Sequence, residues 1–162
     1  MAVWWPAYIA LGSNLDDPHA QALKAIEKLR AMRETRVVLV SPLYGSKPLG
    51  ESARFDFVNG VVGVLTQLDA LTLLQELRII ETSLGRPAQH ERWGPRVIDL
   101  DLLVYAHESR SDPDLTLPHP GIVNRNFVLY PLADIAPDLD VPGLGRAAGL
   151  KERIAPTGLW PL

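Results

Sequence analysis

Two amphipathic helical patterns, each set between runs of strand-forming residues, restrict the fold of this chain more than any other feature. Apolar residues recur every three or four positions in both patterns, which places them on one face of a helix. The first stripe consists of Leu23, Ile26, Leu29 and Met32, and the second of Ala70, Leu73, Leu74, Leu77, Ile80 and Leu84. A helix with one apolar face must bury it against another layer, so a sheet should lie beneath both helices.

The residues that flank the two stripes are typical of helix ends. Asp16-Asp17-Pro18 predicts the start of the first helix, since a carboxylate caps the free amide groups and proline fits the first turn. Asp69 has the same capping role before the second stripe. Gly85 is expected to end that helix, because glycine readily adopts the left-handed conformation found after helices.

Four β-rich runs surround these helices. They cover residues 8–11, which lead into the turn Gly12-Ser13-Asn14, and residues 36–40, 55–65 and 96–105. Asn59-Gly60 is a strong hairpin signal, but the first arm of that hairpin would be short, so we expect one continuous strand. The remaining segments are expected to be a loop at 42–50, a short helix at 122–135 and a loop from Pro137 to the end.

The order strand, helix, strand, strand, helix, strand, followed by a C-terminal extension, predicts an α+β fold. This is the plan of the ferredoxin-like βαββαβ sandwich, with an antiparallel sheet and its helices on one face. A chain of 162 residues has the size of one ordinary domain, which we assign to residues 1–162. Many functions share this fold, so the fold selects none of them.

Composition argues against several classes of function. The formal net charge of −3 is wrong for a general binder of polyanions, so we expect no nucleic-acid partner. The chain has no cysteine, which excludes disulfides and thiolate chemistry. The N-terminus does not resemble a signal peptide, and no apolar run reaches the roughly 18 residues of a membrane span. We expect a cytoplasmic, monomeric enzyme that acts on small molecules.

Asp99 and Asp101 form the most informative pair in the sequence. Side chains of a strand alternate between its faces, so the two carboxylates point the same way while Ile98, Leu100, Leu102 and Val104 point the other way and can be buried. Two such charges repel by about 2–3 kcal/mol at an effective dielectric of about 20. Mg²⁺, which takes one or two carboxylates together with substrate phosphates, would offset this repulsion. A solvated strand face paired with arginines is the alternative.

A basic loop leads directly into this acidic pair. Arg86, His90, Arg92 and Arg96 lie within eleven residues of one another. Guanidinium groups bind phosphate oxygens in a bidentate manner. Metal-binding carboxylates next to arginines are typical of phosphoryl-transfer sites. An ordinary solvated surface loop is the alternative for these residues.

Two further segments carry polar groups that could bind a ligand. His119 lies between two prolines and could donate to a phosphate, as Arg125 could; a loop histidine without a role and a surface charge are the alternatives. Asn59 could bond the edge of a heterocycle. Phe57 and Phe127 could stack on that heterocycle, although core packing is the usual role of phenylalanine.

Taken in order, these segments resemble a known family. Arg92-Trp93-Gly94-Pro95-Arg96 followed by Asp99-Leu100-Asp101 is similar to the signature of the 6-hydroxymethyl-7,8-dihydropterin pyrophosphokinases, and the resemblance extends from about Tyr8 to Pro142. It implies transfer of the pyrophosphoryl group of ATP to the pterin hydroxyl, with AMP as the leaving group, in tetrahydrofolate biosynthesis. A nucleotide-binding module without turnover and a phosphohydrolase that uses the same metal pair are the alternatives.

The resemblance also implies a role for each matching residue. Asp99 and Asp101 would hold two Mg²⁺ ions that bridge the phosphates of the co-substrate ATP. The phosphates would be contacted by Arg86, Arg92, Arg96, His119 and Arg125, and the nucleoside by Glu81 and Leu102. Trp93 would close over the site. The pterin pocket would consist of Phe57, Phe127, Asn59 and backbone groups of Ser46, Lys47 and Leu49. The chain departs from the family pattern at Ala88, Asp114 and Ser46.

Overall fold

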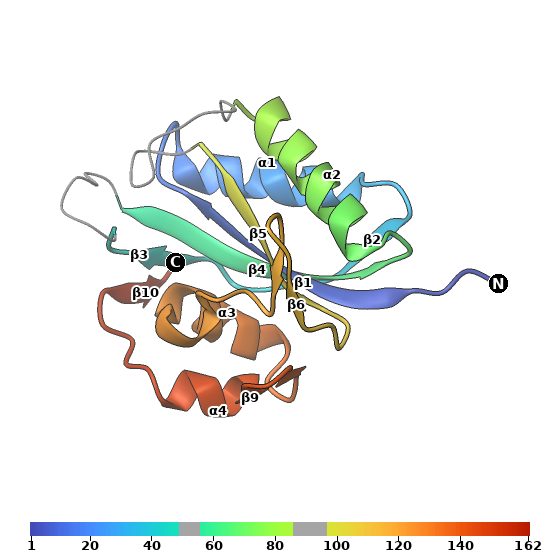
Figure 1. Ribbon diagram of the computed structural model, residues 1–162. Coiled ribbons are helices and arrows are strands. Elements are labelled where there is room, and N and C mark those ends of the chain that lie inside the picture. The colour runs from blue at the N-terminus through green and yellow to red at the C-terminus, as the bar shows by residue number, and fades with distance from the viewer. Residues whose placement is uncertain (49–55, 86–96) are drawn as a thin grey trace.

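The computed structural model describes residues 1–48, 56–85 and 97–162, and its centre is a six-stranded antiparallel sheet (Figure 1). Strand β1 lies in the middle, between β4 and β5, and the order along the sheet is β10-β3-β4-β1-β5, with β2 also paired to β4. The strands are β1 (Trp5–Ser13), β2 (Thr35–Val40), β3 (Tyr44–Ser46), β4 (Phe57–Thr66), β5 (Asp99–Tyr105) and β10 (Leu159–Pro161). The predicted ferredoxin-like core is confirmed by the arrangement of β1, β2, β4 and β5.

Helices α1 (Pro18–Arg30) and α2 (Ala70–Ser83) cover one face of this sheet. Both predicted starts are confirmed: Asp17 accepts the Ala20 amide at 3.3 Å, and Asp69 accepts the Thr72 amide at 2.8 Å. The stripe of α1 differs from the prediction. Leu23 is 48% exposed, whereas the buried positions are Ala22, Ala25, Ile26 and Leu29. Helical spacing rotates Leu23 off the face that these four residues share.

Strand β4 is continuous, as expected, but the segment before it is more regular than predicted. Residues 42–50 were expected to be a loop, whereas Tyr44–Ser46 forms β3 and pairs with the first half of β4. Strand β2 pairs with the second half of β4. Ser41 joins the two, because its hydroxyl accepts the Val61 amide at 2.9 Å while its own amide donates to the Val61 carbonyl at 2.9 Å. These bonds replace a short stretch of the strand ladder.

A bulge at Leu103 reverses the face of the sheet to which the following residues of β5 point. Leu100 and Leu102 pack towards α1 and α2 as predicted, but Val104 belongs to the cluster on the opposite face, so its predicted position is wrong. The register explains this: Ile9 pairs with Leu102 and Tyr8 with Val104, which leaves Leu103 as an extra residue. An extra residue in one strand shifts the residues after it to the other face.

The C-terminal part covers the second face of the sheet, which corrects two predictions. The helices do not lie on one face alone, and the tail after Pro137 is not a loop. The predicted helix at 122–135 is divided at Arg125, which has an extended backbone. The elements of this part are η1 (Ile122–Asn124), α3 (Asn126–Ile135), β8 (Asp140–Val141), β9 (Gly145–Arg146) and α4 (Ala147–Glu152).

A small hairpin, β6 (Arg110–Ser111) and β7 (Thr116–Leu117), connects β5 to this second layer. It brings His119 back towards the sheet, since the His119 amide donates to the Leu103 carbonyl of β5 at 2.8 Å. Among the helices of the described ranges, none is both long and apolar enough to cross a membrane.

Candidate active site

The register of three strands places the two predicted halves of the site on one face of the sheet. Gly12 of β1 pairs with Asn59 of β4 on one side and with Asp99 of β5 on the other, and Ala10 pairs with Asp101. Directly paired residues share a face, so Asn59 and Asp99 face the same side across Gly12. Their backbones lie two strand spacings apart, which is about 10 Å. Two small molecules bound at these positions would therefore be neighbours.

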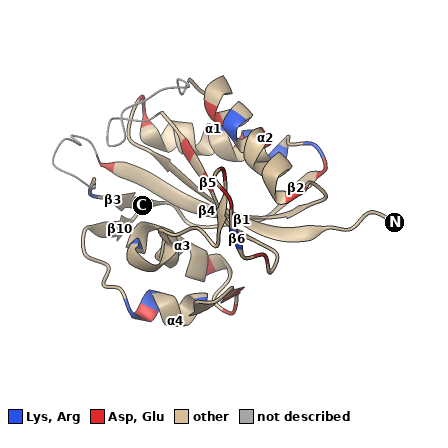
Figure 2. Ribbon diagram, in the orientation of Figure 1, with Lys and Arg blue, Asp and Glu red and all other residues tan. Residues whose placement is uncertain are grey.

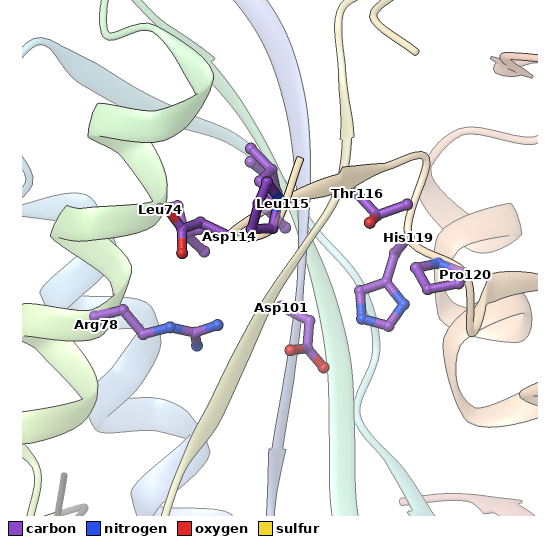
Figure 3. Close-up of a pocket in the computed structure, with 10 residues that line it drawn as sticks. Leu74, Arg78, Asp101, Asp114, Leu115, Thr116, His119 and Pro120 are labelled. Carbon is purple, nitrogen blue, oxygen red and sulfur yellow. The ribbon is translucent and has the colours of Figure 1, made fainter. Parts of the chain in front are cut away.

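A pocket of about 200 Å³ opens beside this row of residues, between α2, β5 and the β6–β7 hairpin. Figure 3 shows the Asp101 carboxylate between the Arg78 side chain of α2 and the His119 ring. Figure 2 shows acidic positions on β5 and a basic position on α2. The pocket is lined by Leu74, Arg78, Asp101, Leu102, Pro113, Asp114, Leu115, Thr116, His119 and Pro120.

The electrostatics of Asp101 suit a cation site. Burial, together with the negative charge of Asp99, raises the pKa of Asp101 to about 6 from 3.8. Arg125 and Arg78 oppose this rise without cancelling it. An ionised Asp101 is thus short of positive charge, which a divalent ion would supply. Within the described ranges, no group of three or more His, Asp or Glu residues is arranged to hold a metal, so an ion here would need water and phosphate ligands, as Mg²⁺ prefers.

His119 is held in a defined orientation. Its Nδ1 accepts the Gly121 amide at 2.9 Å, so in the neutral ring the proton resides on Nε2. Burial and the neighbouring Arg125 charge lower the pKa of His119, while Asp99 opposes the shift. The ring is therefore neutral at pH 7 and has one free donor, Nε2–H, which a phosphate oxygen can accept. The pocket-lining position of this ring agrees with that role.

Arg125 lies next to His119 because Gly121 leaves room for it. A Cβ built on Gly121 would approach the Arg125 guanidinium carbon to 2.7 Å, so only glycine lets the side chain pack there. The same guanidinium lies 6.0 Å from the centre of the Phe127 ring. Arg125 thus connects the predicted phosphate side with the predicted pterin side.

Glu81 lies behind the acidic pair. It is 2% exposed, and its Oε2 accepts the Leu100 amide at 2.7 Å. Its Oε1 accepts from the Arg78 guanidinium at 2.9 Å, and Arg78 also donates to the Leu100 carbonyl at 3.4 Å. Leu100 separates Asp99 from Asp101, so Glu81 and Arg78 hold the backbone that carries both carboxylates. The expected contact of Glu81 with a nucleoside stays a prediction.

The other side of the row is built around Asn59, which is 4% exposed. Its side-chain amide donates to the Ser46 hydroxyl at 2.7 Å and to the Tyr44 carbonyl at 3.4 Å. The Asn59 Oδ1 lies 3.4 Å and the Phe57 ring 3.8 Å from the Cβ position of Gly12. Both groups therefore border the space beside Gly12, which has no side chain to fill it. Phe127 lies in the first turn of α3. It is half-buried against the apolar residues on the sheet face opposite α1 and α2.

Several predicted site residues lie outside the described residues, and others were not predicted. The first group consists of Leu49, Arg86, Arg92, Trp93 and Arg96. Lys47 is described and is exposed, with its ammonium 3.6 Å from Asp56. Sequence reasoning did not single out Arg78 or Thr116. For Arg78 there was a signal, because it precedes Glu81 by three residues on a helix, a spacing at which opposite charges pair.

The chain is similar in sequence and in fold to known proteins. The model of the family described as 7,8-dihydro-6-hydroxymethylpterin-pyrophosphokinase (HPPK) matches residues 8–137. A 2-amino-4-hydroxy-6-hydroxymethyldihydropteridine pyrophosphokinase of Pseudomonas aeruginosa is 48% identical over 135 residues, which is 83% of each chain. The protein of the same name from Haemophilus influenzae is 45% identical over 136 residues, which is 84% of each chain.

A solved structure of related fold is the HPPK-DHPS of Plasmodium falciparum. It matches with a TM-score of 0.75 at 14% identity, over 94% of this chain and 45% of that longer chain. At this identity the match concerns the fold. The family match and the two curated relatives show more: the chain belongs to the 7,8-dihydro-6-hydroxymethylpterin-pyrophosphokinase family.

Proposed function

We propose that this chain carries out the reaction of its family. It transfers the pyrophosphoryl group of ATP to the hydroxyl of 6-hydroxymethyl-7,8-dihydropterin, giving AMP and the pterin diphosphate, a step of folate synthesis. The observation that carries the proposal is the strand register, which sets Asn59 and the Asp99–Asp101 pair on one face across Gly12. A pterin bonded to Asn59 would then present its hydroxymethyl group to phosphates held beside the aspartates.

The co-substrate ATP is assigned to the pocket beside Asp101. Leu102 and Leu74 supply apolar walls for the base, while His119 supplies the Nε2–H donor for a phosphate oxygen. Arg125 adds a positive charge near that oxygen. Arg86, Arg92 and Arg96 are assigned to the phosphates by the family resemblance, and Trp93 to the closing of the site.

Magnesium is the metal that this donor set fits. Asp99 and Asp101 would hold the two Mg²⁺ ions, since two carboxylates on one face, with the pKa of Asp101 raised by its partner, need a hard divalent cation. When bound, Mg²⁺ neutralises phosphate charge and acidifies the attacking hydroxyl. The chain's own contribution is to orient the two substrates and to stabilise charge, so we assign no general base.

The pterin is assigned to the pocket around Asn59, as the family resemblance implies. The Asn59 side chain presents its Oδ1 acceptor to the edge of the heterocycle, since its amide group donates to Ser46 and Tyr44. Phe57 and Phe127 would lie on its two faces, and backbone groups of Ser46, Lys47 and Leu49 would complete the pocket. We also keep the cytoplasmic location and the monomeric state as proposals.

One assay tests the reaction. The chain mixed with ATP, Mg²⁺ and the reduced hydroxymethylpterin is expected to release AMP and to form the pterin diphosphate, detected by chromatography and mass. Excess EDTA is expected to stop the reaction, and added Mg²⁺ to restore it. Release of inorganic phosphate without pterin diphosphate would indicate a phosphohydrolase. Nucleotide binding without any product would indicate a binding module, and either result would overturn the proposal.

Gly12→Val is expected to raise the KM for the pterin by at least about tenfold, because small displacements at a reacting centre are costly. The valine Cβ would lie 3.4 Å from Asn59 Oδ1, and its two methyl groups would fill the space between Asn59 and Asp99. Valine is favourable in strands, so the melting temperature should stay close to that of the unchanged chain. Gly12→Ala is the matched control, since its single methyl makes only an ordinary contact. An unchanged KM in Gly12→Val would place the pterin elsewhere.

A further inference from the structure

The edge of the sheet that carries Ser46 is completed by the very end of the chain. Strand β3 has only three residues, and β10 pairs with it on the side away from β4. Two backbone bonds extend this pairing: the Lys47 amide donates to the Gly158 carbonyl at 2.9 Å, and the Leu162 amide donates to the Leu43 carbonyl at 3.1 Å. A strand this short has little ladder of its own, so its position depends on both neighbours.

Trp160 of β10 packs directly against the backbone of β3. A Cβ built on Gly45 would lie 2.2 Å from the indole Nε1 and 2.3 Å from Cε2, so the ring occupies the space that a side chain would fill. The Lys47 ammonium lies 5.6 Å from the ring centre, within the range of a cation–π contact. Neighbouring residues of a strand face opposite sides, so the ring supports β3 from behind Ser46.

The segment before β10 is attached to the other wall of the pterin pocket. The Asn126 side chain, at the start of α3, donates to the Ala155 carbonyl at 3.0 Å and to the Thr157 carbonyl at 2.9 Å. The Tyr130 hydroxyl donates to the Ile154 carbonyl at 2.9 Å. We call residues 154–162 the C-terminal strap. It is fixed at one end beside Phe127 and at the other beside Ser46.

We propose that the C-terminal strap, through Trp160, positions the pterin side of the active site. The inference rests on the proposed function, because it takes Asn59, Ser46 and Phe127 as the pterin pocket. The family model ends at residue 137, so the family match assigns no role to the strap. Trp160 is a positioning residue: it holds Gly45, and through Gly45 it keeps the Ser46 hydroxyl 2.7 Å from the Asn59 amide.

The strap should affect one substrate and not the other. Ser46 and Asn59 lie on β3 and β4, whereas the pocket assigned to ATP is lined by α2, β5 and the β6–β7 hairpin. Loss of the Trp160 ring would free β3 and leave those other elements in place. The expected signature is therefore a change in the KM for the pterin with an unchanged KM for ATP.

Trp160→Ala is the first test. We expect it to raise the KM for the pterin by about 10-fold to 100-fold, as for a displaced positioning group, and to change the KM for ATP by less than about twofold. Trp160→Phe keeps a ring over Gly45 and should recover most of the affinity. Trp5→Ala is the matched control, because Trp5 is 45% exposed and pairs with Thr66 at the far end of β1. Equal changes in both KM values, or no change, would overturn the inference.

Gly45→Ala tests the same contact from the other side and decides the matter if Trp160→Ala does not fold. The new methyl group would push the ring off β3, so the KM for the pterin should again rise while that for ATP stays constant. In the double variant, Gly45→Ala with Trp160→Ala, the methyl group takes space that the ring has left. We expect its effect to be smaller than the sum of the two single effects. Additive effects would show that the two residues act independently.

Hydrogen exchange of the free protein separates this inference from the proposed function. Trp160→Ala should speed exchange at the amides of 45–47 and 59, with no change at 99–105, and no substrate is needed for this measurement. If the unchanged chain forms no pterin diphosphate, the proposed function fails. The exchange result still tests whether Trp160 holds β3 in place. If the exchange pattern is unaltered in Trp160→Ala, Trp160 does not hold β3 in place, and the inference is wrong whatever the chain catalyses.

Discussion

Replacing Asp101 with asparagine is expected to lower turnover by about 10³-fold, the size of effect that follows from removing a group that stabilises developing charge. The asparagine would keep the volume of the side chain and one of its two acceptor oxygens, and it would lose the charge that the proposed Mg²⁺ needs. The measurement is the rate of AMP formation at saturating ATP and pterin, together with a titration of Mg²⁺. We expect the Mg²⁺ requirement to rise steeply in the variant.

The same substitution should make the metal-free protein more stable at neutral pH. The folded-state pKa of Asp101 is about 6, above the ordinary value of 3.8. Ionisation of this group therefore opposes folding, and its cost grows as the pH rises from about 4 to about 6. An asparagine side chain cannot ionise, so the melting temperature of Asp101→Asn without Mg²⁺ should exceed that of the unchanged chain at pH 7 and match it near pH 4.

Asp112→Asn is the matched control for Asp101→Asn. Asp112 is an exposed residue of the neighbouring hairpin, where it pairs with Arg110 at 3.1 Å. It lies outside the pocket lining, and both the activity and the melting temperature of this variant should stay close to the unchanged values. Full activity of Asp101→Asn, or equal losses in both variants, would contradict the metal role of Asp101.

Glu81→Ala is expected to cause the largest loss of stability, about 2 kcal/mol, since it leaves the buried Leu100 amide without its acceptor. That amide now donates to Glu81 Oε2 at 2.7 Å. The guanidinium of Arg78 would also lose its carboxylate partner, but it is about half exposed and can bond to water, so its share of the loss is small. Denaturant unfolding followed by circular dichroism gives the free energy of unfolding directly.

Glu76→Ala provides the comparison on the same helix. Glu76 pairs with Arg33 at 3.2 Å at the surface, and exposed pairs of this kind contribute under about 1 kcal/mol. The substitution should thus cost less than half as much as Glu81→Ala. Glu81→Ala should also lower the affinity for Mg²⁺, because Leu100 carries the peptide groups between Asp99 and Asp101. Equal destabilisation by the two variants would show that the bond from the Leu100 amide to Glu81 contributes no more stability than an exposed ion pair.

Local signals predicted the core of this fold well. The capping aspartates, Asp17 and Asp69, mark the helix starts correctly because a cap depends on a few adjacent residues. The facing of Asp99 and Asp101 followed from strand alternation alone. The hairpin signal at Asn59-Gly60 was correctly set aside, and β4 passes through it.

What local signals could not supply is pairing between distant segments. Strand β3 is too short to be recognised and exists because β4 and β10 lie on its two sides. The bulge at Leu103 depends on the register with β1, and the sequence of β5 alone does not indicate which strand it pairs with or in which register. The bonds of Glu81 to Leu100 likewise join residues 19 positions apart. The shared face of Asp99 and Asp101 could thus be inferred from the sequence, whereas the groups that support it could not.

The extra residue at Leu103 has a consequence for how this chain can change in length. Before Leu103, β5 directs its carboxylates to the face of the proposed site. After Leu103, the same strand supplies Val104 to one core and Tyr105 to the other. Deleting one residue between positions 102 and 104 would force either the aspartates or the following side chains onto the wrong side. The surface turn at residues 107–109 can vary in length without this penalty. Among relatives, gaps and insertions should therefore accumulate in that turn and be absent from the few residues around Leu103.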